Sequence, residues 1–100
     1  HWQERYELPD GTEHLRGQLM IGFAKGTRLT TGHVGFCPSF QSIPIVQVTT
    51  DYDALEVSVT AAEILPWGVR IECRVEEPID EGTSIPVFLT VNKPLESSTS

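Results

Sequence analysis

The sequence has few positive charges, because its 100 residues include 7 Lys and Arg against 14 Asp and Glu, for a formal net charge of −7. This sign repels phosphate groups, and the basic residues are scattered rather than clustered. Nucleic acids and anionic membrane surfaces are therefore poor partners. Acidity of this size keeps a small domain soluble, and a cationic partner is the alternative reason for it.

Long apolar runs are also absent, so no segment predicts membrane insertion. The N-terminal residues contain neither an initiator Met nor the apolar centre of a signal peptide, which indicates a processed chain or a fragment of a longer one. Two cysteines are too few for a disulfide framework, and they leave the compartment open. Cys73 lies between apolar residues and is expected to be buried, whereas Cys37 is expected to point away from the core, which disfavours a disulfide between them.

Signatures of enzymes and metal sites are missing too. His33 and Cys37 share a face of a predicted strand, but four residues at ~3.3 Å each place them ~13 Å apart, too far for a thiolate–imidazole pair. The three histidines lack ligand spacing. The acidic turns at 51–53 and 76–81 could bind calcium, although solvated turns are the favoured interpretation. We therefore expect no enzyme, no catalytic residue, no metal site and no cofactor, with calcium left open.

Most of the sequence consists of short segments in which apolar and polar residues alternate. In the clearest one, Leu55, Val57 and Val59 alternate with polar residues, which predicts that these three side chains face a core. Six such strands are expected near residues 15–23, 32–36, 45–50, 55–60, 69–75 and 85–91. Sustained helical periodicity is absent, and this spacing of strands and turns predicts an all-β fold, a six-stranded antiparallel β-sandwich.

The length allows one hydrophobic core and is too small for two, so a single domain is expected. Residues 1–11 end in a Pro-Asp-Gly turn and are interpreted as a lead-in or linker. Residues 12–95 form the predicted sandwich. Residues 96–100, rich in serine, are expected to be a disordered tail.

Aromatic residues in turns are the best clue to a binding site. Trp67 lies in a Pro-Trp-Gly turn and Tyr52 lies between two aspartates. Amphipathic rings at loop tips often bind sugars or proteins. The alternative for Trp67 is that its ring folds back and covers one end of the sandwich.

The succession of apolar segments resembles the H-type lectin domain, the agglutinin module of invertebrates and slime moulds. The segments that carry this resemblance are residues 32–36, 40, 43–48, 55–57 and 64–69. It extends over about Leu15 to Val91. The resemblance implies a six-stranded sandwich that assembles as a homotrimer, sometimes paired into a hexamer. It also implies galactose-type sugars bound between subunits, a role in cell adhesion, and an extracellular or surface-exposed location.

The expected sugar-contacting positions differ from the family pattern. Glu56 stands where the family has an arginine, and Glu76 and Glu77 replace a Trp-His pair. Gly82 falls where a stacking tyrosine is expected. These changes remove the ring platform and the bidentate donor, so a family-like N-acetylgalactosamine site is not expected. An acidic cleft remains, suited to a cationic or calcium-bridged ligand or to no small ligand.

Two functions follow as predictions. The first is a carbohydrate-binding, lectin-like domain that acts as an oligomer, with Glu56, Glu76, Glu77, Tyr52 and Trp67 lining a site between subunits. The alternative is a structural trimerisation or assembly module of a fibre, adhesin or larger complex that binds no sugar. The expected partner is accordingly a glycan or a protein.

Overall fold

A computed structural model describes residues 2–93, and the tail expected at 96–100 lies outside that range. Seven strands form within it, and its described residues contain no helix that could cross a membrane. The strands are β1 (Trp2–Glu7), β2 (Glu13–Phe23), β3 (Leu29–Gly35), β4 (Ile45–Thr49), β5 (Val57–Leu65), β6 (Gly68–Val75) and β7 (Thr83–Lys93). The fold is thus all-β, as the alternation predicts, with one strand more than expected.

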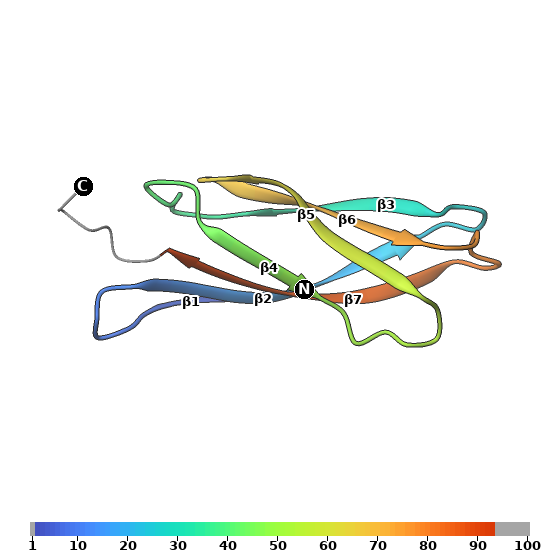
Figure 1. The fold of residues 1–100 in the computed structure, drawn as a ribbon, viewed down its shortest axis with the longest axis horizontal. Coiled ribbons are helices and arrows are strands. Elements are labelled where there is room, and N and C mark those ends of the chain that lie inside the picture. Colours follow the sequence, from blue (N-terminus) through green and yellow to red (C-terminus); the bar gives the residue numbers. More distant parts are fainter. Residues whose placement is uncertain (1, 94–100) are drawn as a thin grey trace.

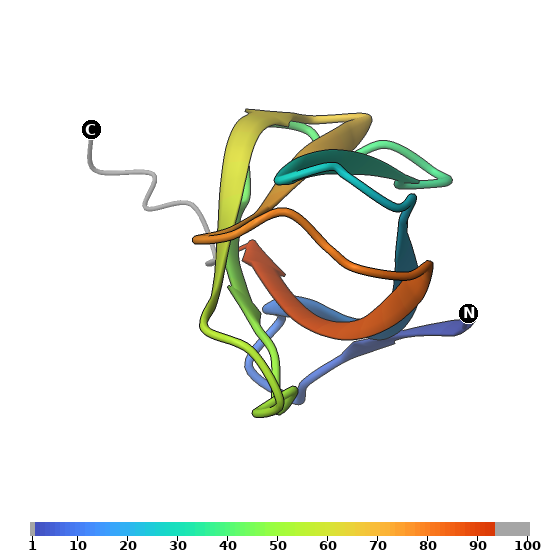
Figure 2. The same ribbon diagram turned by 90° about the vertical axis from the view of Figure 1, so that its right-hand side faces the viewer.

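The strands form two antiparallel sheets that pack face to face (Figure 1). One sheet has the order β1-β2-β7-β4, and the other has the order β3-β6-β5. In the end-on view of Figure 2, β4 lies beside β5 and closes one side of the sandwich. The molecule is elongated, with extents of 52 × 22 × 20 Å.

The core follows directly from period-two alternation along the long central strands. Leu19, Ile21 and Phe23 of β2 are 2–6% exposed, and the alternate residues Ile85 and Val87 of β7 are 0% exposed. Their partners across the core are contributed by β6, where the expected inward residues are also buried. Both cysteines are free; Cys73 is buried in this core and Cys37 is exposed.

The interpretation of residues 1–11 as a linker is wrong for Trp2–Glu7. These residues form β1, which pairs with β2 from Trp2 opposite Gln18 to Glu7 opposite Glu13. Most of β1 is exposed on both faces, so it lacks the apolar alternation that marks a strand in sequence. The turn that follows forms as expected, because Gly11 has φ 89° and its N–H donates to the Leu8 carbonyl at 2.9 Å.

The close approach of β1 to β2 depends on Gly17. A Cβ added at Gly17 would lie 2.8 Å from the Trp2 carbonyl oxygen and 3.2 Å from the Gln3 Cβ. The absence of a side chain therefore lets the two backbones pair at this point.

The prediction that Leu55 faces inward is also wrong. Leu55 precedes β5 and is 41% exposed, whereas Val57 and Val59 are half-buried against the core. The strand extends instead to Leu65, with a β-bulge between Ala61 and Glu63. The alternation in the sequence therefore begins two residues before the paired strand. The bulge interrupts the alternation, so the sequence did not predict that the strand continues to Leu65.

Candidate functional site

The five residues predicted to bind a ligand lie in three different places. Glu56, Glu76 and Glu77 meet at one corner, and Tyr52 is half-buried against the core. Trp67 lies at the opposite end of β6 from Glu76, and nine residues at ~3.3 Å each separate the two by ~30 Å. One sugar ring cannot touch both ends, so the five residues do not form a single small-molecule site.

The pairing of β5 with β6 creates the acidic corner. Val57 is opposite Val75, so Glu56 and Glu76 leave the ladder side by side. The Val75 N–H donates to the Arg28 carbonyl at 2.9 Å, which brings Arg28 to the same corner. The acidic corner therefore forms at the open end of the β5–β6 hairpin, where strand pairing stops.

Two shallow hollows share this corner. The first, of about 450 Å³, lies between Glu56, Glu76, Arg28 and Arg74. The second, of about 420 Å³, adds Glu77. Neither has an aromatic ring in its lining, so the corner offers hydrogen-bonding and charged groups without a platform for stacking a sugar.

The loop that follows the corner is fixed by a buried residue. Ile79 is 4% exposed, its carbonyl accepts the Gly26 N–H at 2.7 Å, and its own N–H donates to the Thr27 carbonyl at 3.2 Å. The sequence suggested only an acidic solvated loop, yet Ile79 ties the loop to the turn before β3. The backbone that carries the neighbouring acidic side chains is therefore held in place by Ile79.

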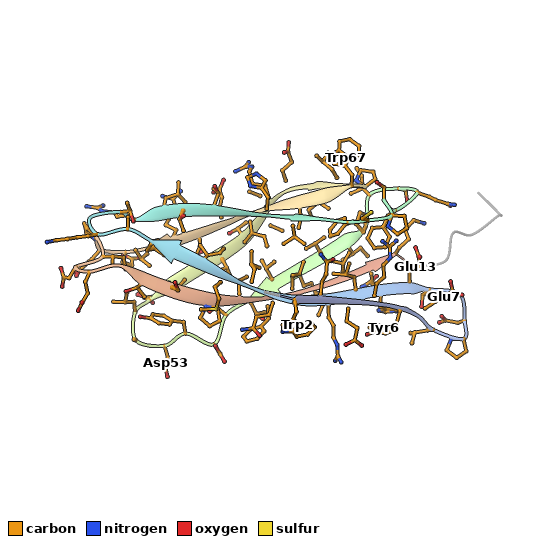
Figure 3. All side chains as sticks on the ribbon, turned by 180° about the vertical axis from the view of Figure 1, so that it is seen from behind. Trp2, Tyr6, Glu7, Glu13, Asp53 and Trp67 are labelled. Carbon is orange, nitrogen blue, oxygen red and sulfur yellow. The ribbon has the colours of Figure 1, made fainter. Side chains whose placement is uncertain are left out.

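Trp67 lies in a different and smaller hollow, of about 200 Å³, on the outer face of the three-stranded sheet. Its ring is 60% exposed, and Figure 3 shows it projecting from the sandwich, so the alternative that it covers one end of the core is wrong. The backbone below it is held firmly, since the Trp67 carbonyl accepts the Phe36 N–H at 2.9 Å and the Pro66 carbonyl accepts the Phe40 N–H at 2.8 Å. The backbone of this turn is therefore held by hydrogen bonds, while the indole of Trp67 is exposed to solvent.

A row of three polar side chains lies beside the ring. Leu65 and Gly68 pair across the two-residue turn, and counting back from it places Glu63 opposite Arg70. On the other side, Arg70 is opposite His33 of β3. These three residues and Trp67 line the same hollow, which we call the Trp67 hollow.

The charges of the Trp67 hollow are partly compensated. Arg70 Nη1 donates to Glu72 Oε2 at 2.8 Å, and both side chains are about one-third exposed. Glu63 contributes a second carboxylate on the other side of Arg70. The hollow therefore combines a ring, a free carboxylate acceptor, and guanidinium and imidazole groups, with no large excess of either charge.

This set of groups suits a sugar. An exposed indole can stack on the C–H face of a pyranose, while a carboxylate accepts hydrogen bonds from hydroxyl groups and a guanidinium donates them. Pockets for drug-sized ligands are ~300–1,000 Å³, so the smaller Trp67 hollow fits one ring-sized group. The sequence singled out Trp67 but missed Glu63 and Arg70, which the hairpin register could have located.

The described residues provide no activated nucleophile or metal cluster near these hollows. Burial raises the pKa of the Cys73 thiol, which keeps it protonated. Within residues 2–93, no group of three or more His, Cys, Asp or Glu side chains is arranged to hold a metal ion.

No family model matches the sequence, and no curated protein matches it. Two solved tailspike structures are similar in fold. The Gp54 tailspike of Acinetobacter baumannii bacteriophage AP22, solved in complex with A. baumannii capsular saccharide, superposes with a TM-score of 0.69 at 10% identity over 79% of this chain and 16% of that one. The Pseudomonas phage phi297 tailspike gp61 gives 0.62 and 13% over 81% of this chain and 15% of that one.

The chain therefore spans about a sixth of the length of each tailspike. Identity this low shows a shared fold and nothing more specific. A similar fold thus occurs as part of two larger tailspike proteins, one of them solved in complex with a capsular saccharide. The resemblance to H-type lectins stays a prediction.

Proposed function

We propose that this chain is a carbohydrate-binding module of a longer, fibre-type protein and that the Trp67 hollow is its sugar site. The observation that carries the proposal is the exposed indole of Trp67 beside Glu63, Arg70 and His33 on one rigid sheet face. The occurrence of the fold within a tailspike solved with a saccharide supports it. The module binds without catalysis.

Binding at such a hollow is shallow. Trp67 stacks on one sugar ring, Glu63 accepts hydroxyl hydrogens, and Arg70 and His33 donate to ring or hydroxyl oxygens. A contact with one ring gives weak affinity, which multiplies when several copies bind a repeating glycan together. An oligomer, whether trimer or hexamer, therefore suits this function.

The acidic corner is a separate candidate contact. Glu56, Glu76 and Glu77 lie too far from Trp67 to reach the same sugar ring, but an extended glycan could reach both. Their carboxylates would then accept hydroxyl hydrogens from a different ring of the chain. Calcium bridging at this corner remains the lesser proposal.

A matched pair of variants tests the site. Glu63→Gln and Glu56→Gln each remove one exposed carboxylate, from the Trp67 hollow and the acidic corner respectively. On a glycan array with the intact protein, with and without calcium, we expect Glu63→Gln to lose at least about tenfold in binding, since a hydrogen bond to a charged group contributes ~1.5–3 kcal/mol and about 1.4 kcal/mol is tenfold. Glu56→Gln should bind glycans that are too short to reach the acidic corner as wild type does. The reverse pattern would move the site to the acidic corner.

Failure to bind any glycan, with or without calcium, would reject the carbohydrate function. The assembly module would then be the better account. That second candidate rests on a different observation, the apolar outer face of the four-stranded sheet described below.

A further inference from the structure

The face of the four-stranded sheet that points away from the core is a second unpartnered surface, which we call the outer face. Because Leu15, Gly17 and Leu19 of β2 are buried, the alternate residues Arg16 and Gln18 point outward. The cross-strand register extends this face over all four strands in rows. Its members are Trp2, Glu4, Tyr6, His14, Arg16, Gln18, Met20, Ile45, Gln47, Thr49, Pro86, Phe88, Thr90 and Asn92.

Large apolar side chains are exposed on this face. Trp2 is 49% exposed, Tyr6 40%, Met20 50% and Ile45 51%. Figure 3 shows Trp2 and Tyr6 on the side of the sheet that faces away from the second sheet. Tyr6 is held in place by stacking on His14, with ring centroids 5.5 Å apart and planes at 12°. The register puts the Glu4–Arg16 row between Tyr6 and Ile45 on one side and Trp2 and Met20 on the other. Exposed apolar side chains distributed over one sheet face indicate an interaction surface.

The charge of the outer face indicates which partner fits it. Among the described residues that define this face, counting histidine as neutral, the formal charges are Glu4 and Arg16, and these form an ion pair at 3.4 Å. The face is therefore neutral, while the chain as a whole carries −7. Two copies of the chain repel each other through most of their surface, and the outer face is where they can approach without facing like charges.

The opposite face of the sandwich differs in this respect. The outer side of β3-β6-β5 presents the charged row around Arg70 and the ion pair with Glu72. Its large exposed apolar residues are Leu29, at 43%, and Trp67, at 60%, and Trp67 lies beside that charged row. Charged groups thus accompany the apolar residues of this face, whereas the two charges among the residues that define the outer face are paired with each other, so apolar contact between copies is favoured on the four-stranded sheet.

From these observations we infer that a second copy of this chain packs against the outer face. At ~3.3 Å per residue and ~4.8 Å per strand, strands of 6, 11, 5 and 11 residues form a face of roughly 500 Å². Two such faces bury roughly 1,000 Å², the lower limit for a specific interface. The association is accordingly of moderate strength and depends on protein concentration. The Trp67 hollow, on the opposite sheet, stays open in the assembly.

Sedimentation of the intact protein over a micromolar to millimolar concentration range tests this inference. We expect wild type to self-associate, and Met20→Lys and Ile45→Lys each to raise the dissociation constant at least about tenfold, because each places an unpaired charge in the contact. Both positions are half exposed, so the monomer tolerates the change, and circular dichroism checks its fold. Leu29→Lys is the matched control on the other sheet and should leave association unchanged.

Two outcomes would overturn the inference. One is a wild-type chain that stays monomeric throughout the range, which would assign the face to a different partner. The other is a Leu29→Lys variant that dissociates as much as the two outer-face variants.

Discussion

Arg5 fastens β1 to the sandwich, and its replacement gives the sharpest test of how the N-terminal strand is held. The guanidinium lies 4.2 Å from the centre of the Phe40 ring, donates to the Pro38 carbonyl and pairs with Glu13 at 3.4 Å. Its side chain is 20% exposed, so these contacts are partly shielded from water. Arg5→Met keeps an apolar chain on Phe40 and removes all three charged contacts.

The expected cost is shared by the three contacts of the Arg5 guanidinium. A charge-assisted hydrogen bond contributes ~1.5–3 kcal/mol, a cation–π contact at a partly exposed site ~0.5–1, and a partly exposed ion pair ~0.2–1. These values are not additive, since one group makes all three contacts. We expect opening of β1 to become about 2 kcal/mol easier, which is a fall of roughly 30-fold in its amide protection.

Native-state hydrogen exchange of the β1–β2 ladder measures this effect. Arg16→Met is the matched control, because Arg16 pairs with Glu4 at the same 3.4 Å but both side chains are more than half exposed. That variant should change protection by less than about 0.5 kcal/mol. Equal effects of the two replacements would refute the conclusion that Arg5 anchors β1.

Three further outcomes are expected. Ile79→Ala should lower the free energy of unfolding by about 2–4 kcal/mol in chemical denaturation, because it empties the buried position that anchors the acidic loop. A thiol reagent should label Cys37 quickly and Cys73 only on unfolding, since burial raises the pKa of Cys73. The backbone N–H and hydroxyl of Thr12 lower the pKa of Asp10, so its stabilising effect is present above pH 3.8 and lost as pH falls through the folded-state pKa. The difference in melting temperature between wild type and Asp10→Ala should therefore shrink in acid. Labelling of Cys73 in the native protein would contradict the expectation for the two cysteines.

Most of the scaffold could be predicted because its long strands are apolar on one face and polar on the other. This holds for β2, β6 and β7, where every second residue enters the core. It fails for β1, whose large apolar residues Trp2 and Tyr6 point outward, so its pattern lacks an inward face. The outward orientation of these apolar residues therefore explains both why β1 was not predicted and why the outer face is apolar.

The candidate sites were harder to predict because they depend on register. Glu56, Glu76 and Glu77 line one hollow, and their separation from Trp67 becomes visible only once β6 is known to run between them. Glu63 lies beyond the strand expected at 55–60, and the bulge beside it shifts the pairing by one residue. The pattern within one strand therefore predicts which face a residue lies on, whereas its neighbours across the sheet are known only from the register of strand pairing.

The central claim is that the Trp67 hollow binds a sugar, and the two tryptophans of the chain allow a direct measurement. Each indole N–H gives its own resonance in a nitrogen–proton NMR spectrum, and Trp2 lies on the opposite sheet as an internal control. Titration of the intact protein with the glycan that binds best on the array should shift the Trp67 resonance and leave that of Trp2 in place. A bound glycan that leaves the Trp67 resonance unmoved would contradict the account.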